Sequence, residues 1–466
     1  MDRTQQLELN RWLAKQTRKL LVIRGARQVG KSTLVRLFAE QNETVSLLEI
    51  NLERHPDLQP FFADKDPAKL LNVIEALPGI APRSPDSILF LDEIQAIPEA
   101  IPMLRYLFED MPDRPVIAAG SLLEFVLSQH HFSMPVGRVQ YLHMGPMTFI
   151  EFLQALDESK LVDEILTYDI GKQINAIAHK RLLERLRHYY FVGGMPEAVD
   201  TFVKTGRLQE VSEVHNAIIE TYREDFPKYG GSRNLSRMLT VFNFAARNVG
   251  IKIKYSNISS HDQSKTLKND IDLLCMARVV SKVLHSHCTG LPLQADIEEK
   301  IYKLLFMDVG LMNAICGLGW HTLSQMDEVK LVNEGTIAEQ FVGQHLLALN
   351  AHSPNREVNY WLREGKAANA EVDYVISVDD KIIPIEVKAG SSGRLKSLHQ
   401  FAGEKNTPFA VRFDTGMAST QHIKTTIQKS GKPVDVQYKL ISLPLYLIER
   451  LPSLIQTKRY FSDSDG

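Results

Sequence analysis

The chain has 466 residues, of which 44% are hydrophobic and 24% charged, and this composition is ordinary for a soluble globular protein. Its length predicts about two to four domains. The net charge of −2 excludes a bulk attraction to nucleic acid, so any such attraction must come from a local patch.

The three cysteines, Cys275, Cys288 and Cys316, are widely spaced and form no C-x-x-C pair. An odd number without metal-ligand or redox spacing predicts free thiols in a reducing compartment. No apolar run approaches the length of a bilayer span, and the polar first residues lack the apolar core of a signal peptide. We therefore expect a cytoplasmic protein without a membrane partner.

The first chemical motif lies between an apolar run, Leu20–Ile23, and a stretch of helical spacing that follows it. It matches G-x-x-x-x-G-K-[ST], the phosphate-binding loop, whose glycines let backbone N–H groups face a phosphate. The N-terminus of the following helix adds partial positive charge. Lys31 is expected to reach the β- and γ-phosphates of ATP, and Ser32 to hold Mg²⁺. The expected nucleotide contacts are Gly25, Ala26, Arg27, Gln28, Val29, Gly30, Lys31, Ser32 and Thr33.

The second nucleotide motif is the run Ser87–Ile94, in which a stretch of apolar residues ends in Asp92 and Glu93. A buried strand would deliver Asp92 to its C-terminal tip, where the carboxylate can hold the water shell of Mg²⁺. Glu93 is placed to polarise the attacking water. The alternative is a strand that merely ends in two acids, and the phosphate-binding loop upstream favours the ATP site.

The roles of two further positions near these nucleotide motifs, Ser121 and Arg138, stay open. The run Val116–Ser121 predicts a strand, and Ser121 at its end either senses the γ-phosphate or sits in a tight turn. An alternating run from Val139 to His143 predicts a last strand. Arg138, just before it, is either a charge-neutralising arginine at the nucleotide or a solvated surface residue. Strands that alternate with helices predict a parallel sheet, whose ligands lie beyond the strand C-termini.

The middle of the chain changes character twice. Residues 151–230 are mostly helical in pattern and predict a lid or linker. Residues 233–290 then hold nine Lys or Arg against three acids, in a helix, short helix, helix order followed by two apolar segments. That order is the plan of a winged helix, expected over 231–322, with Lys265 and Lys268 on the exposed face of its last helix. The alternative is a helical unit that contacts protein, so DNA and protein partners both stay open.

The second chemical constellation lies in the C-terminal part. An amphipathic helix carries Glu339 near its start. Two later strands that can pair as a hairpin carry Asp373 on the first, and Glu386 and Lys388 on one face of the second. Asp373 and Glu386 form a carboxylate pair suited to Mg²⁺ or Mn²⁺, and Glu339 would complete the site. Lys388 would orient or deprotonate the attacking water, or stabilise charge on the phosphate.

The alternative for these residues is a lysine–carboxylate cluster that only holds the two strands of the hairpin together. Burying three charges in apolar strands without partners is costly, so they must pair with one another or bind a metal. The E-x-K pattern recurs elsewhere in the chain, and only Glu386 lies in an apolar strand that follows another strand carrying an acid.

With both ends read, the chain resembles a family of prokaryotic ATPases that join an AAA-type P-loop domain to a C-terminal domain similar to PD-(D/E)XK nucleases. The resemblance covers nearly the full length and implies ATP binding and hydrolysis in a bacterial or archaeal cytoplasm. The matching motifs are Gly25–Ser32, Leu89–Glu93, Gly120–Ser121, Gly137–Arg138, Gly145–Phe149, Glu151–Leu153, Gly193–Glu197, Phe306–Leu311, Glu339, Glu371–Asp373 and Pro384–Lys388.

The expected fold is therefore α/β, with four domains. An AAA-type P-loop parallel-sheet domain is expected over 1–150, a helical lid over 151–230, a winged helix over 231–322, and an α/β PD-(D/E)XK nuclease-like domain over 323–466. The sequence leaves the oligomeric state open.

Two functions stay open as well. The first is an ATPase coupled to a DNA-directed, Mg²⁺-dependent nuclease in DNA processing or defence. The second is an ATP-switched regulator that binds DNA or protein and carries an inert nuclease fold. For the first function, the expected catalytic residues are Lys31, Glu93, Asp373, Glu386 and Lys388.

Overall fold

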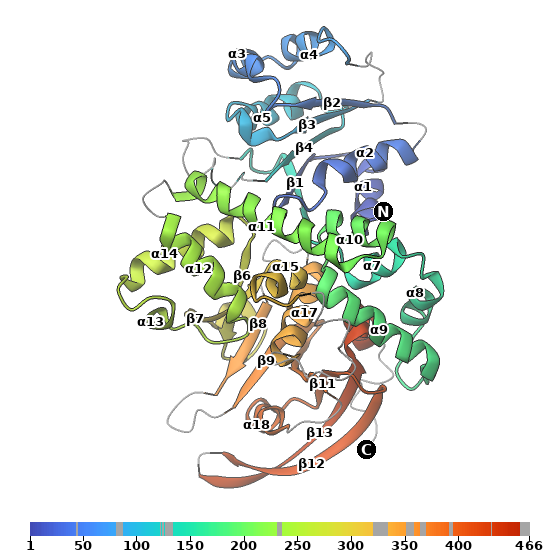
Figure 1. The fold of residues 1–466 in the computed structure, drawn as a ribbon, viewed down its shortest axis with the longest axis vertical. Coiled ribbons are helices and arrows are strands. Elements are labelled where there is room, and N and C mark those ends of the chain that lie inside the picture. The colour runs from blue at the N-terminus through green and yellow to red at the C-terminus, as the bar shows by residue number, and fades with distance from the viewer. Residues whose placement is uncertain are drawn as a thin grey trace. The chain divides into compact units, whose positions relative to one another are not determined.

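The computed structural model describes residues 1–42, 45–80, 87–121, 123, 125, 134–230, 235–319, 334–350, 358–363, 370–390, 395–429 and 431–456. The chain divides into two compact units (Figure 1). The first unit comprises Met1–Met147 and Asp272–Val279, and the second comprises Thr148–Ile271 and Val280–Gly466. Each unit is built around one sheet.

The first unit contains a five-stranded, all-parallel sheet. Its strand order is β2 (Leu47–Asn51), β3 (Ile88–Asp92), β4 (Val116–Gly120), β1 (Leu20–Gly25) and β5 (Val139–Met144). Both β3 and β4 are buried along their whole length, because helices cover a parallel sheet on its faces. In this order β4 lies between β1 and β3, so the ends of these three strands come together at one edge.

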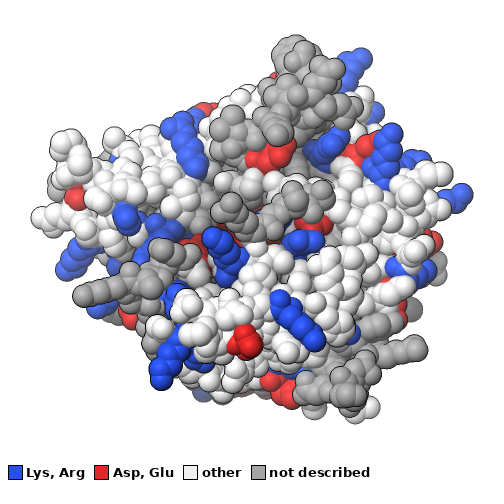
Figure 2. All heavy atoms as spheres, turned by 90° about the horizontal axis from the view of Figure 1, so that it is seen from below, with Lys and Arg blue, Asp and Glu red and all other residues white. Residues whose placement is uncertain are grey.

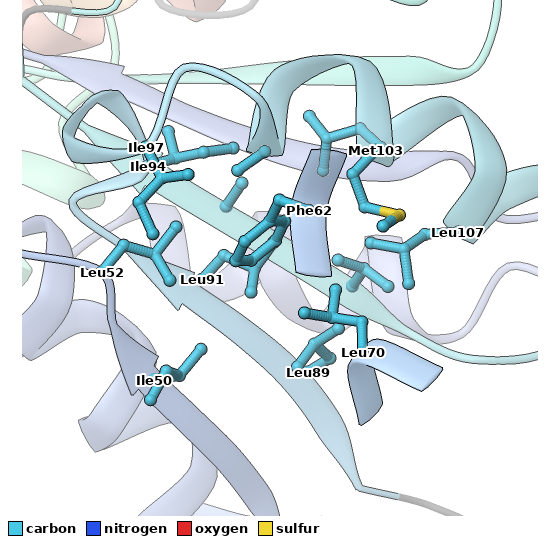
Figure 3. Packing of buried hydrophobic residues seen from close by; sticks show 14 of the residues in the cluster. Ile50, Leu52, Phe62, Leu70, Leu89, Leu91, Ile94, Ile97, Met103 and Leu107 are labelled. Atoms are coloured by element: carbon cyan, nitrogen blue, oxygen red, sulfur yellow. The ribbon is translucent and has the colours of Figure 1, made fainter. Parts of the chain in front are cut away.

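Helices of the first unit pack their apolar sides onto this sheet. In Figure 3, Phe62, Leu70 and Leu107 lie over Leu89 and Leu91 of β3. Burying each such side chain contributes roughly 1.5–3 kcal/mol. The helices are α1 (Gln5–Leu13), α2 (Lys31–Gln41), α3 (Gln59–Ala63), α4 (Pro67–Glu75) and α5 (Ala100–Asp110), with 3-10 turns at Pro56–Leu58 and Ile94–Ala96.

The second unit contains a mixed eight-stranded sheet. Its order is β12 (Ser419–Lys429), β13 (Lys432–Pro444), β11 (Phe409–Asp414), β10 (Lys381–Val387), β9 (Glu371–Val378), β8 (Val358–Leu362), β6 (Val280–Ser286) and β7 (Ile297–Phe306). The strands β9 and β10 pair antiparallel around a short turn, which is the hairpin expected from the sequence.

Helices of this unit precede and interrupt its strands. They are α7 (Phe149–Ala155), α8 (Ser159–Leu166), α9 (Ala176–Val192), α10 (Pro196–Thr205), α11 (Leu208–Gly230), α12 (Leu235–Arg247), α13 (Tyr255–Ile258), α15 (Val309–Ile315), α17 (Glu334–Leu349), α18 (Lys396–Lys405) and α19 (Leu451–Gln456). The division between the units passes through α14 (Ser264–Met276). Short 3-10 turns lie at Leu293–Asp296 and Leu445–Arg450.

The helices α12, α13 and α14 and the hairpin of β6 and β7 follow one another in the order expected for a winged helix. The hairpin is not a separate wing, however, because β6 also pairs in parallel with β8. The strands expected for the winged helix and for the nuclease-like domain therefore belong to one sheet. Among the residues that the structure describes, no helix combines the length and the apolar character needed to cross a membrane.

A close approach at Gly343 joins α17 to this sheet. A Cβ at this position would overlap Tyr374 Oη of β9 and lie 2.6 Å from Leu305 Cδ2 of β7. Tyr374 and Leu305 are both buried, so neither can move aside cheaply.

We therefore predict that Gly343→Ala lowers the free energy of unfolding by about 1–3 kcal/mol, because it overpacks this contact. Urea unfolding followed by circular dichroism measures the change. Gly335→Ala in the first turn of the same helix is the control, since a Cβ there meets nothing within 4 Å. An equal response of the two variants would contradict the packing account.

Candidate functional site

The phosphate-binding loop has the backbone shape that its sequence predicts. Gly30 precedes α2 with φ 88°, in the left-handed region that favours glycine, and Gln28 also has a positive φ of 61°. At Gly25 a Cβ would overlap the carbonyl oxygen of Met144, so only glycine fits beside β5. Lys31 Nζ lies inside the loop, donating to the carbonyl oxygens of Ala26 at 2.8 Å and Gly25 at 3.3 Å.

Asp92 meets the loop across the sheet. Ser32 Oγ donates a hydrogen bond of 2.7 Å to Asp92 Oδ1, although the two residues are 60 positions apart. Asn51 Nδ2 donates to Asp92 Oδ2 at 3.4 Å. Burial raises the pKa of Asp92, the Ser32 hydrogen bond lowers it, and the nearby Glu93 raises it further. A carboxylate whose charge is this poorly solvated gains free energy from a bound cation.

Glu93 and Ser121 lie at the ends of neighbouring strands. Glu93 follows β3 with a positive φ of 50°, and Gln95 Nε2 donates to its Oε2 at 2.5 Å. Ser121 follows β4, which lies between β1 and β3. Within the part of the chain that the structure describes, its buried hydroxyl has no hydrogen-bond partner. This placement leaves the Ser121 hydroxyl available to a ligand at the strand ends.

Arg138 is not brought to the loop. It precedes β5, and its carbonyl oxygen accepts a hydrogen bond from the Leu20 N–H at the start of β1. Gly25 lies at the other end of β1, where it pairs with Met144. The Arg138 side chain instead pairs with Glu109, with Nε 2.7 Å from Oε1. This position agrees with the second of the two roles considered for Arg138, that of a solvated surface residue.

In the second unit, Asp373 and Glu386 lie across the hairpin of β9 and β10. Tyr374 pairs with Ile385, which places Asp373 beside Glu386. Asp373 Oδ2 accepts from the Val387 N–H at 2.7 Å, and Lys388 Nζ lies 2.5 Å from Glu386 Oε1. Burial raises the pKa of both carboxyls, and the mutual repulsion of the acidic groups adds to the shift at Asp373.

Sequence reasoning missed Lys303, a buried lysine in the same cluster. Its side chain is 1% exposed, and Nζ lies 3.1 Å from Glu339 Oε1 and 2.5 Å from Glu371 Oε1. Nζ also lies 4.9 Å from the ring centre of Tyr360. Burial lowers the pKa of Lys303, but the surrounding carboxylates, Glu339 first, more than offset this and raise it. The available signal was a lysine inside the otherwise apolar end of its strand.

The cluster fits a divalent cation in part. Glu386 Oε2 is buried and, among the described residues, has no hydrogen-bond partner, so it and Asp373 offer oxygens to a cation. Two lysines face four carboxylates there, which leaves two formal negative charges. Glu339, however, is held by Lys303. No group of three or more His, Cys, Asp or Glu among the described residues is arranged to hold a metal ion.

The basic segment 233–290 presents only some of its charges. Arg237 pairs with buried Asp270, with Nη2 3.2 Å from Oδ1, so it is not free for a nucleic acid. Lys265 and Lys268 are exposed on α14, as expected. On the face drawn in Figure 2, Lys and Arg side chains are dispersed among neutral residues rather than gathered in one patch.

Comparison with known domain families decides the character of the N-terminal region. Residues 17–153 match an AAA domain. Residues 17–153 are an AAA-type P-loop ATPase domain. That match implies the use of ATP and Mg²⁺. Residues 183–322 match a domain of unknown function (DUF8612), and residues 334–438 match another (DUF4143). Neither description names an activity, so the nuclease-like character of the C-terminal part stays a prediction.

Two solved structures are distantly similar to the chain. The Aeropyrum pernix Orc1 protein in complex with DNA has 13% identity and a TM-score of 0.31, over 70% of this chain and 95% of that one. The C. elegans PCH-2 has 13% identity and a TM-score of 0.22, over 55% and 59%. No curated protein matches the chain. The ATPase assignment therefore rests on the domain match and on the loop geometry.

The raised pKa of Asp373 should make the stability of the fold depend on pH. A carboxyl with a higher pKa in the folded state lowers the free energy of unfolding as pH rises from the ordinary carboxyl range through the raised pKa. Asp373→Asn removes this titration. We therefore expect the melting temperature of the variant, measured relative to that of the wild type, to increase as pH rises from 5 to 8. Differential scanning fluorimetry measures the gain, with Asp380→Asn in the exposed turn of the same hairpin as control. A gain of the same size at both pH values would contradict the account.

Proposed function

We propose that the chain is an ATP-hydrolysing switch, with ATP and Mg²⁺ bound at the loop 25–33. The observation that carries this proposal is the hydrogen bond between Ser32 and Asp92, which brings the two nucleotide motifs to one point. In P-loop ATPases these two side chains hold the metal between them.

The roles of the other residues follow from their places around the loop. Lys31 would leave the carbonyl oxygens of its own loop and move to the β- and γ-phosphates, because an ammonium gains more from phosphate charge than from carbonyls. Glu93 would orient the attacking water and accept its proton. Ser121 would donate its hydroxyl to the γ-phosphate.

We predict that Lys31→Ala reduces ATP hydrolysis at least about a hundredfold, because it removes charge stabilisation at the transferred phosphate. Glu93→Gln is expected to bind ATP with nearly unchanged affinity but hydrolyse it at least about a hundredfold more slowly. Phosphate release and fluorescent-nucleotide binding measure the two effects. Arg138→Ala is the control and should retain the wild-type rate within about twofold. A Lys31→Ala variant with wild-type hydrolysis would contradict the proposal.

We further propose that the second unit is a DNA-directed nuclease-like module. Asp373 and Glu386 would hold Mg²⁺ or Mn²⁺, which would polarise the scissile phosphate. Lys388, paired with Glu386, would orient the attacking water or stabilise charge on the phosphate. Exposed Lys265 and Lys268 of α14 would contact the DNA backbone.

A specific observation favours a second candidate function. Lys303 already neutralises part of the acidic cluster, so these residues can keep a nuclease-like fold without cleaving a substrate. The chain would then be an ATP-switched regulator that binds DNA or protein. Its DNA affinity would depend on ATP, while DNA would remain intact.

Cleavage separates the two candidates. We predict that the wild type cuts DNA with Mg²⁺ or Mn²⁺ in the presence of ATP, and that Lys388→Met lowers the rate at least about a hundredfold. Gel electrophoresis of linear, circular and single-stranded substrates measures the rate. Lys424→Met, which removes the same charge from an exposed position of β12, is the control. Absence of cutting by the wild type on every substrate would favour the regulator.

A further inference from the structure

Lys303 is a buried charge that the proposed reaction does not use. It lies on β7, while its two carboxylate partners come from α17 and β9. In the sheet order β7 is separated from β9 by β8 and β6, so the side chain reaches across to meet Glu371. A buried lysine with this reach is expensive to keep, because its ammonium must be removed from water. The surrounding carboxylates offset that cost.

Glu339 is fixed by three separate contacts. Lys303 donates to its Oε1, and Tyr374 Oη donates to its backbone oxygen at 2.8 Å. The backbone of Gly250 also lies against the carboxylate, where a Cβ would overlap Oε2. Gly250 has φ +75°, so glycine is favoured there for its backbone shape as well as for this close approach. Glu339 therefore carries the Lys303 ammonium on Oε1 and packs closely against Gly250.

Asp373 and Glu386 differ from Glu339 in this respect. Lys303 forms no hydrogen bond with either of them among the described contacts, and Glu386 Oε2 has no hydrogen-bond partner there. Asp373 as a residue is of intermediate exposure. Lys303 thus occupies Glu339 and Glu371. Glu386 pairs with Lys388, whose side chain is 27% exposed and can move toward solvent, and its Oε2 has no hydrogen-bond partner among the described residues.

We propose that Lys303 is a resident counter-ion that withholds Glu339 from a divalent cation, so that the cation binds through Asp373 and Glu386 alone. This inference rests on the cation site of the proposed function and deepens it. The ammonium and a divalent cation compete for the same carboxylate, because both need the Glu339 oxygen and like charges repel at such distances. Lys303 therefore sets how tightly the cluster holds its cation.

The test is a double-mutant cycle on Mn²⁺ binding to the nucleotide-free protein, measured by isothermal titration calorimetry. Lys303→Met keeps the length of the side chain and removes its charge. We expect this variant to bind Mn²⁺ at least about tenfold more tightly than the wild type, since Glu339 becomes available. Glu339→Gln alone should change the wild-type affinity by less than about twofold, but should remove the gain in the Lys303→Met background. Lys300→Met, at an exposed position of the same strand, is the charge-matched control.

Stability gives a second readout that does not depend on activity. Lys303→Met leaves Glu339 and Glu371 without their shared cation, so its melting temperature should fall in EDTA and recover with Mn²⁺ more than that of the wild type. If Lys303→Met fails to fold in EDTA and also fails to fold with added Mn²⁺, the inference is overturned, because a divalent cation is then unable to replace the ammonium.

The remaining outcomes separate this inference from the proposed cation site. If Glu339→Gln weakens wild-type Mn²⁺ binding as strongly as Asp373→Asn does, Glu339 is already a ligand, and the inference fails while the cation site stands. The inference also fails if Lys303→Met binds Mn²⁺ no more tightly than the wild type. If neither the wild type nor Lys303→Met binds Mn²⁺, the cation site itself fails.

Discussion

Carboxylates withdrawn from water beside a sheet are the constraint on which both units depend. A carboxylate removed from water must be paired, hydrogen-bonded or protonated, and each unit solves this differently. At Asp92 the hydrogen-bond partners are a hydroxyl and an amide, and the Arg36 guanidinium lies 4.0 Å from Oδ2. At Glu339 the partner is the ammonium of Lys303, while Glu386 keeps one oxygen without a partner among the described residues. A cation gains most at a carboxylate oxygen that has no charged partner at hydrogen-bond distance.

The two sheets place these groups by different rules. In the parallel sheet of the first unit, the strand ends gather at one edge, so Asp92 meets Ser32 although they are distant in sequence. In the mixed sheet of the second unit, the antiparallel hairpin of β9 and β10 places Asp373 beside Glu386, and Glu339 arrives from a helix. The first site thus depends on the pairing of strands that are distant in sequence, whereas the second combines a local hairpin with a helix and a distant strand.

This difference explains how much the sequence could predict. The loop Gly25–Ser32 is contiguous, and its partner Asp92 is found by the rule that strand ends meet. Arg138 precedes its strand, so the same rule places it at the far edge, away from the nucleotide. Lys303 is marked locally only as a lysine in an apolar stretch, and its meeting with Glu371 depends on the order of four strands. The merging of β6 and β7 with the C-terminal strands is likewise a tertiary event that spacing and propensity do not encode.

The central claim is that each unit has an incompletely compensated carboxylate site for a divalent cation. Anomalous X-ray diffraction from crystals grown with Mn²⁺ and a non-hydrolysable ATP analogue tests it directly. We expect one Mn²⁺ beside Ser32 and Asp92, and a second between Asp373 and Glu386 with Lys303 still on Glu339. Absence of Mn²⁺ from either site, or a second ion bound by Glu339 with Lys303 displaced, would contradict it.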